Sequence, residues 1–444
     1  MSGARKNIIL FSFDDAVTFY HYANVFKEPL QIPNLDAFRK QSTVFHKAYC
    51  QSPICGPSRA SLMSARTPHQ LGVFQNDDSV FDRINARDMW PYLLKQNGYF
   101  CSSGGKVHHY YRPLRRRHHR VLYSDEQKRW RADMRLPGVV EKRAYGGHRR
   151  GYGTTDTDYD AEYYDHKSAD SAISFIENYD DDAPFYREIG FYSPHGPHYT
   201  PARFKEMYNR RAFTKPAAWA SGYDETDYAA KRYPANIAGY PDKWWQMSVR
   251  NYYSALSHGD YHFGRIMSAL FKSKHAANTV VIVLSDHGFH LGNRERFKKT
   301  TMWEQVASVP LMIFDPHQKG ARDVEDPVAL LDVGRTVLDY AGVAPDAQHM
   351  GQSLRSLVDG HSGADRVIPT FHHGDVSARV GAFRIIRYCD GSTEFFDINN
   401  DPWQLKNLGS SHPEYATAYQ KLIETARAYG FDPELGEAIP AGPD

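Results

Sequence analysis

Two pairs of side chains that could bind a metal each follow a short apolar run. The pairs are Asp14-Asp15, after residues 8–13, and Asp286-His287, after residues 280–285. Runs of this kind are typical of buried parallel strands, whose carboxyl ends meet at one edge of a sheet. Three carboxylates and an imidazole at that edge would suit calcium, magnesium or manganese. Taken separately, each pair could equally cap a helix or lie in a solvated loop.

A cysteine in an unusual context is the third candidate for chemistry. Cys55 is followed by Gly56 and Pro57, and Ser58-Arg59 opens a short helix that we expect over residues 58–65. The amino end of a helix stabilises negative charge, and Arg59 adds a fixed cation. The context therefore suits an activated thiolate nucleophile, although a small buried cysteine in a turn would show the same pattern.

The segment that begins at Cys55 resembles the signature of the type I, formylglycine-dependent sulfatases of the alkaline phosphatase superfamily. The motif C-x-P-S-R is followed by Ala60-Ser61-Leu62-Met63-Ser64. The resemblance covers most of the framework in the family's order, namely residues 8–15, 34–72, 104–109, 193–201, 280–310 and 396–408. Residues 285–292 are most similar to the iduronate-2-sulfatase and choline-sulfatase branches, because arylsulfatases more often have Asn in place of His287.

The resemblance implies a sulfuric ester hydrolase with one divalent metal ion, expected to be Ca2+, with Mg2+ or Mn2+ as alternatives. It also implies a maturing enzyme, formylglycine-generating or anaerobic, that oxidises Cys55 to formylglycine (3-oxoalanine), whose hydrate is the nucleophile. The implied metal ligands are Asp14, Asp15, Asp286 and His287. Among the other implied catalytic residues, Arg59 steadies the formylglycine, and Lys106 and Lys299 contact the sulfate. His109 is implied to free sulfate from the covalent intermediate, and His195 to lie near the leaving oxygen.

Two of these assignments have a close neighbour as an alternative. The neighbours are His108 for His109 and His198 for His195, and Lys298 adjoins Lys299. We expect His108 and His198, together with Asn76, to contact the substrate. The sequence departs from the family where D-D-x-G becomes Asp14-Asp15-Ala16-Val17, so the first loop is expected to differ.

Strands and helices alternate through the first 365 residues. We expect strands at residues 8–13, 100–103, 184–192, 280–285 and 309–314, and helices at 58–65, 88–97, 160–179, 244–271 and 329–341, with a further helix opening at Pro33. This alternation, with the resemblance, predicts an α/β, alkaline-phosphatase-like three-layer domain with a mostly parallel central sheet over residues 1–365. Residues 104–160 and 193–245 lack periodicity, and we interpret them as walls of a substrate pocket.

The pattern changes after about residue 365. Short antiparallel strands are expected at residues 370–371, 383–388 and 393–396, with a turn at Asp390-Gly391, and a helix at 414–429. Residues 366–444 are therefore predicted to form a small C-terminal α+β domain with a short antiparallel sheet.

Composition excludes several other classes of protein. The formal net charge of +2 gives no general affinity for nucleic acid or membranes, and the sequence contains no apolar run long enough to span a bilayer. The four cysteines form no C-x-x-C pair, so a zinc ribbon or a redox motif is not indicated. The amino-terminal apolar run resembles a strand rather than a signal peptide, which predicts a cytoplasmic protein, or a periplasmic or secreted one if a leader has been removed.

The expected substrate is a sulfated small molecule or glycan, with a carbohydrate sulfate first. Residues 112–120, reading RPLRRRHHR, could be a solvated loop or could recognise an anionic polymer, and we prefer a sulfated glycan to a nucleic acid. The alternatives are a phosphonate monoester or phosphodiester hydrolase with the same site, and a non-catalytic glycan-binding protein. Nothing in the sequence argues against a homo-oligomer.

Overall fold

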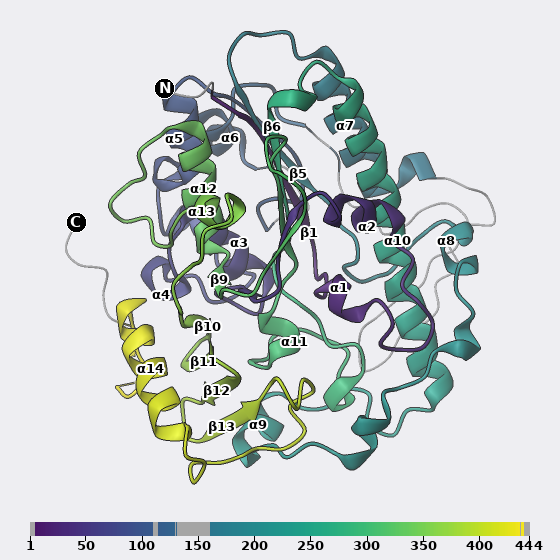
Figure 1. Ribbon diagram of the computed structural model, residues 1–444, viewed down its shortest axis with the longest axis vertical. Coiled ribbons are helices and arrows are strands. Elements are labelled where there is room, and N and C mark those ends of the chain that lie inside the picture. The colour runs from purple at the N-terminus through teal and green to yellow at the C-terminus, as the bar shows by residue number, and fades with distance from the viewer. Residues whose placement is uncertain (1–4, 110–113, 129, 131–159, 436, 439–444) are drawn as a thin grey trace.

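A computed structural model describes residues 5–109, 114–128, 130, 160–435 and 437–438 (Figure 1). Its centre is a seven-stranded sheet in the order β4-β5-β1-β6-β7-β2-β8. The strands are β4 (Phe100–Gly105), β5 (Phe185–Gly190), β1 (Asn7–Phe13), β6 (Thr279–Ser285), β7 (Leu311–Phe314), β2 (Thr43–Phe45) and β8 (Arg322–Val324). Within this sheet β7 alone runs against the others, which confirms the prediction of a mostly parallel sheet.

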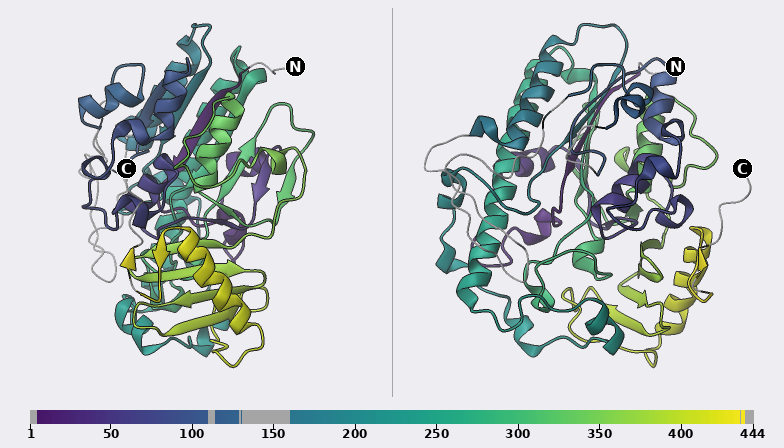
Figure 2. Two further views of the ribbon diagram at one scale, coloured as in Figure 1. Left: turned by 90° about the vertical axis from the view of Figure 1, so that its left-hand side faces the viewer. Right: turned by 180° about the vertical axis from the view of Figure 1, so that it is seen from behind.

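Helices cover both faces of the sheet and give the predicted three layers (Figures 1 and 2). One face carries α2 (Pro33–Arg39), α7 (Tyr164–Asn178) and α10 (Asp242–Lys272); the other carries α3 (Cys55–Ser64), α5 (Trp90–Gln96) and α12 (Leu331–Ala341). Successive side chains of β1 alternate between the two cores, because the side chains of a strand point to opposite faces. Ile9, Phe11 and Phe13 join the core under α10, and Ile8 and Leu10 join the other core.

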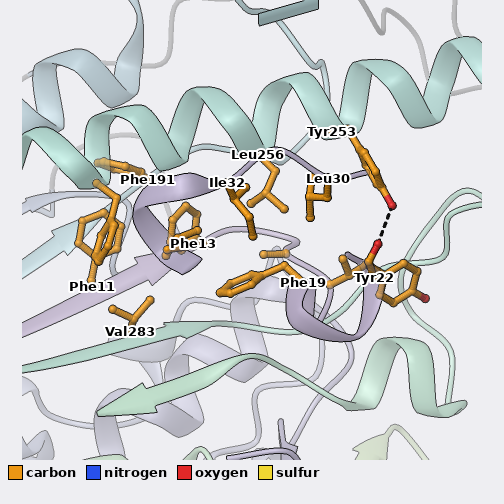
Figure 3. Close-up of a cluster of buried hydrophobic side chains, with 14 of the residues drawn as sticks. Phe11, Phe13, Phe19, Tyr22, Leu30, Ile32, Phe191, Tyr253, Leu256 and Val283 are labelled. Carbon is orange, nitrogen blue, oxygen red and sulfur yellow. Dashed lines mark hydrogen bonds between the residues drawn. The ribbon is translucent and has the colours of Figure 1, made fainter. Parts of the chain in front are cut away.

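Side chains of the segment that follows β1, among them Phe19 and Tyr22, also pack in the core under α10 (Figure 3). The rings of Phe11 and Phe191 meet edge to face at 4.5 Å between centroids. Further along α10, the Tyr253 hydroxyl donates to the carbonyl of Tyr22 at 3.0 Å. The long helix therefore fixes the position of the loop that follows β1.

A four-stranded antiparallel sheet follows in the C-terminal part of the chain, as predicted. It consists of β10 (Ile368–His372), β11 (Asp375–Val380), β12 (Phe383–Arg387) and β13 (Thr393–Asp397), and α14 (Tyr415–Ala428) packs on it (Figure 2). We did not predict β11, whose sequence DVSARV mixes charged and small residues. The domain boundary near residue 365 stays a prediction.

Short elements fill the remaining described segments. They are α1 (Phe19–Tyr22), β3 (Ala48–Tyr49), α4 (Pro68–Leu71), α6 (Arg116–Leu122), α8 (Ala202–Glu206), α9 (Asp227–Arg232), α11 (Glu304–Ala307), β9 (Val328–Ala329), α13 (Arg355–Val358), β14 (Phe431–Asp432) and β15 (Glu437–Ala438). The segments that we interpreted as irregular thus contain helices of less than two turns, which are too short to show a 3.6-residue period.

The basic run at 112–120 is helical from Arg116, so the expectation of a solvated loop is wrong there. Arg112 and Pro113 lie outside the described residues. None of the helices in the described ranges is long and apolar enough to span a membrane.

Candidate active site

The two predicted metal-binding pairs lie at the same edge of the sheet. Strands β1 and β6 are parallel neighbours, and Phe13 is in register with Ser285, so Asp14 and Asp286 leave the sheet side by side. The backbone N–H of Asp15 donates to Oδ1 of Asp286 at 3.1 Å. All three carboxylates are buried. Burying like charges this close requires compensating cations.

The loop after β1 is held by a tyrosine that sequence reasoning missed. Asp15 has a φ of 65°, a left-handed conformation that is costly for a residue other than glycine. The Tyr252 hydroxyl, from α10, donates to the carbonyl of Asp15 at 2.6 Å and accepts from the N–H of Val17 at 2.9 Å. This clamp satisfies two buried backbone groups where the family pattern would have D-D-x-G.

Cys55 is the first residue of α3, so the expected start of this helix at Ser58 is wrong by three residues. The helix can begin earlier because Pro57 then lies in the first turn, where its missing N–H leaves no hydrogen bond unmade. Asn76 accepts from the N–H of Gly56 at 2.7 Å through Oδ1. A Cβ on Gly56 would lie 3.0 Å from Cα of Asn76, which explains the glycine. Asn76, predicted to contact the substrate, thus supports the turn that carries Cys55.

The sulfur of Cys55 is buried at the centre of the charged residues. Its Sγ lies 2.8 Å from Nζ of Lys299, 3.2 Å from Nε2 of His287 and 3.7 Å from Oδ1 of Asp15. Burial alone would raise the pKa of the thiol, but the charges of Lys106 and Lys299 outweigh it and bring the pKa to about 7. The site is therefore built to stabilise an anion at position 55.

Arg59, one turn further along α3, joins the two carboxylates that end β1 and β6. Its Nε donates to Oδ2 of Asp286 at 2.8 Å, and Nη2 lies 3.3 Å from Oδ1 of Asp14. Its remaining N–H groups donate to Ser12 Oγ and to the carbonyls of Phe13, Lys106 and Val107. The Arg59 side chain is almost fully buried and its guanidinium donates to groups of the protein, so Arg59 positions the carboxylates rather than contacting a substrate.

Two lysines complete the neutralisation of the carboxylates. Lys106, just after β4, pairs with Oδ2 of Asp14, and Nζ of Lys299 lies 2.5 Å from Oδ1 of Asp15. Although burial opposes a charge on Lys299, Asp15 and Cys55 outweigh it and raise the lysine's pKa. Burial likewise opposes a charge on Asp15, and Lys299 holds the pKa of this carboxyl well below its usual range. The charges of both lysines also act on the thiol of Cys55.

The same donors fit a divalent cation. Nδ1 of His287 lies 2.8 Å from the carbonyl of Gly288, to which it can only donate, so in the neutral ring the lone pair is on Nε2, 3.3 Å from Asp15 Oδ1. Burial lowers the pKa of His287, but Asp286 and Cys55 outweigh it and raise the pKa to about 9. The position thus favours a cation on this nitrogen, either a proton or a metal ion. Three carboxylates and one imidazole at these separations match the oxygen-rich set that calcium takes.

The predicted histidines lie around this centre, with one exception. His195 contacts the carbonyl of Gly196 at 2.5 Å through Nδ1, and its Nε2 faces Asp15 Oδ2 at 3.9 Å. His109 is largely buried, and burial together with the charge of Lys106 lowers its pKa to about 4. His198 lies against the ring of Tyr252, 5.6 Å between centroids.

His108 is the exception, because it faces the interior. Its Nε2 lies 2.9 Å from the hydroxyl of Tyr123, which donates to Oε2 of Glu188 at 2.6 Å. Burial, reinforced by the charge of Arg59, lowers the pKa of His108 to about 3. A neutral histidine held in this internal network is poorly placed to reach a substrate, and the geometry favours His109 over His108 for the catalytic role.

The three layers, with the charged site at one edge of the sheet, form the alkaline-phosphatase-like fold. Residues 6–343 match the model of the family described as Sulfatase, and residues 292–428 match the family described as N-sulphoglucosamine sulphohydrolase, C-terminal. The first match covers most of the chain, so this protein belongs to the sulfatase family and is a sulfuric ester hydrolase.

Relatives of similar length support the family assignment. A sulfatase of Formosa agariphila is 26% identical over 426 residues, which cover 90% of this chain and 82% of the relative. The choline-sulfatase of Rhizobium meliloti is 27% identical over 410 residues, covering 86% and 78%. The second match agrees with the predicted likeness to the choline-sulfatase branch.

Solved structures with low sequence identity share the fold. A protein in complex with its substrate D-glucosamine-2-N,6-O-disulfate is 21% identical, has a TM-score of 0.75, and the alignment covers 96% of this chain and 98% of that one. The phosphonate monoester hydrolase of Agrobacterium radiobacter is 18% identical with the same TM-score of 0.75 and 96% coverage of both chains. Two substrate chemistries thus occur on this fold.

Proposed function

We propose that the protein releases inorganic sulfate from a sulfated carbohydrate, with formylglycine at position 55 as the nucleophile and one divalent metal ion. The observation that carries this proposal is the position of Cys55. Its buried Sγ lies 2.8 Å from Nζ of Lys299 in a ring of carboxylates and cations at the sheet edge. Oxidation of this cysteine by a maturing enzyme would put an aldehyde hydrate where the structure stabilises an anion.

Asp14, Asp15, Asp286 and His287 would hold the metal ion, which we expect to be Ca2+. The ion, when bound, supplies positive charge that polarises a sulfate oxygen. The chain's own contribution is to keep the four ligands fixed: Arg59 bridges Asp14 and Asp286, and Tyr252 clamps the backbone of Asp15. Fixed ligands lose little freedom when the substrate binds.

Lys106 and Lys299 bind the sulfate group in this proposal. Both ammonium groups pair with carboxylates that would also bind the metal, Lys106 with Asp14 and Lys299 with Asp15. When a metal ion binds the same carboxylates, it neutralises part of their charge, so the positive charge of the two lysines is available to attract an anionic ester. The charges of both lysines act on position 55, and the sulfur atom of the sulfate ester must lie next to this position to be attacked.

Two histidines are assigned to proton transfer. Nε2 of His195 faces the metal-binding edge at 3.9 Å from Asp15, and it protonates the leaving alkoxide. His109 has a pKa lowered to about 4 by burial and by Lys106, so it is neutral near pH 7 and can accept the proton whose removal lets the sulfate leave. His198 and Asn76 remain candidates for substrate contacts from the rim of the site.

A panel of substrates tests this function. Protein co-expressed with a maturing enzyme should release sulfate from at least one sulfated mono- or oligosaccharide, and chelator followed by dialysis should abolish the release until Ca2+ is returned. Choline sulfate and a phosphonate monoester belong in the same panel. If the phosphonate ester turns over faster than every sulfate ester, the sulfate-ester substrate is wrong. Binding of sulfated glycans without any release would favour a glycan-binding protein.

A further inference from the structure

A second group of metal-binding side chains lies where α10 faces the segment that precedes α7. His258 and His262 are one turn apart in this helix, so both rings project from the same face. Asp160, from the short 3-10 helix η3 (Asp160–Glu162) that precedes α7, lies opposite them. Both histidines are buried.

The three ligand atoms of this group converge on one point. Oδ1 of Asp160 lies 2.6 Å from Nε2 of His258 and 3.1 Å from Nε2 of His262, and the two nitrogens are 3.0 Å apart. Ligands of a tetrahedral zinc ion at bond lengths of about 2.0–2.1 Å are about 3.3 Å from one another. Two edges of the triangle are thus within about 0.3 Å of the separation that such an ion needs, and the Asp160–His258 edge must lengthen by about 0.7 Å when the ion replaces the hydrogen-bonding proton between them.

We propose that Asp160, His258 and His262 form a second metal site, selective for a transition ion of the Zn2+ class. Two imidazole nitrogens and one carboxylate oxygen are ligands that Zn2+ prefers, whereas calcium needs more oxygen donors. The centre beside Cys55 has the opposite composition, with three carboxylates and one imidazole. In this proposal the oxygen-rich centre beside Cys55 takes Ca2+, and the separate site at Asp160, His258 and His262 takes an ion of the Zn2+ class.

The surroundings of Asp160 are those of a supported carboxylate ligand. Its second oxygen, Oδ2, accepts from Nη2 of Arg203 at 3.0 Å and lies 3.5 Å from Nδ1 of His166. Groups that hydrogen-bond a ligating carboxylate fix its orientation. Oδ1 is thereby directed toward the two histidines.

One contact must change when the ion binds. Nη1 of Arg265 lies 3.2 Å from Nδ1 of His262, and an arginine can only donate, so Nδ1 is the acceptor in this arrangement. Metal binding at Nε2 moves the ring's proton to Nδ1, and Arg265 must turn away. It retains a partner, because its Nη2 already donates to Asp170 at 2.6 Å.

The site would join segments that lead to the active site. Asp165, near the start of α7, accepts from the N–H groups of Tyr192 and Ser193 at 2.5 and 3.0 Å. On α10, a Cβ at Gly259, the neighbour of His258, would lie 3.2 Å from Cβ of Ser193. An ion that ties η3 to α10 therefore stiffens the support of the segment that carries His195, and its role is structural rather than catalytic.

Zinc retention in the presence of calcium tests the proposal. The full chain is stripped with chelator, saturated with Ca2+, mixed with excess Zn2+, passed through a desalting column and analysed for both metals. Wild type should retain one zinc per chain. His262→Gln and Asp160→Asn should lower zinc affinity by at least ~100-fold, because even the loss of a residue that supports a ligand costs 10–100-fold.

Two control variants separate this site from other zinc binding. His361→Ala removes an exposed histidine, and His287→Ala removes a ligand of the centre beside Cys55; both should keep the zinc. Zn2+ should also raise the melting temperature of wild type and leave that of Asp160→Asn unchanged. Wild type that retains no zinc beside calcium overturns the proposal, and so does equal zinc retention by His262→Gln and wild type.

Discussion

Replacing Arg59 by alanine should destabilise the protein, and calcium should reverse part of the loss. The substitution leaves Asp14 and Asp286 buried without the guanidinium that pairs with them at 3.3 and 2.8 Å. Breaking a buried ion pair from one side costs about 3–5 kcal/mol. In chelator, we therefore expect the free energy of unfolding of Arg59→Ala to fall by about that amount.

Calcium changes this loss because it neutralises the same carboxylates. Without Arg59 the site carries one positive charge fewer, so it should bind Ca2+ more tightly, and each tenfold gain in affinity adds about 1.4 kcal/mol of stability at saturation. The difference between Arg59→Ala and wild type should thus shrink by at least ~1 kcal/mol in saturating Ca2+.

Urea denaturation in chelator and in Ca2+ measures both quantities. The matched control is Arg116→Ala, an exposed arginine in α6, which should stay within about 0.5 kcal/mol of wild type in either buffer. A loss for Arg59→Ala of the same size in both buffers would refute the reasoning that Arg59 and the metal ion share Asp14 and Asp286.

Two further predictions concern single side chains of the site. His195→Ala should lower turnover of a sugar sulfate much more than turnover of nitrophenyl sulfate, because only the sugar alkoxide needs protonation to leave. If His195→Ala lowers both rates equally, and His198→Ala instead lowers the sugar sulfate rate more, then His198 is the acid. Tyr252→Phe should cost about 1–3 kcal/mol and weaken Ca2+ binding, because the carbonyl of Asp15 and the N–H of Val17 lose their partner. Tyr253→Phe, the next residue of α10, removes a bond to Tyr22 and should leave Ca2+ affinity unchanged; calcium titrations of both variants check this.

The sequence predicted the features that depend on local order along the chain. Apolar runs that end in acids predicted β1 and β6 and the position of Asp14 and Asp286 at one sheet edge. The signature at Cys55 predicted a reactive residue at a helix start, although the helix begins earlier than expected. These features could be predicted because hydrophobic pattern and capping are local properties.

Contacts between distant segments could not be predicted in the same way. The clamp from Tyr252 to Asp15 spans 237 residues, and nothing in the helical pattern distinguishes Tyr252 from its neighbour Tyr253. His258 and His262 have a spacing that places both on one helix face, but their third partner, Asp160, is 98 residues from His258. Strand β2 was missed because three residues are too few to show alternation.

The state of residue 55 tests the central claim most directly. Samples made with increasing amounts of maturing enzyme can be compared by peptide mass spectrometry at position 55 and by sulfate release from the best sugar sulfate. We predict that residue 55 becomes lighter than cysteine and that the rate of release rises in proportion to the converted fraction, extrapolating to zero for the unconverted thiol. Full activity in a sample whose peptide carries only the Cys55 thiol would contradict the account.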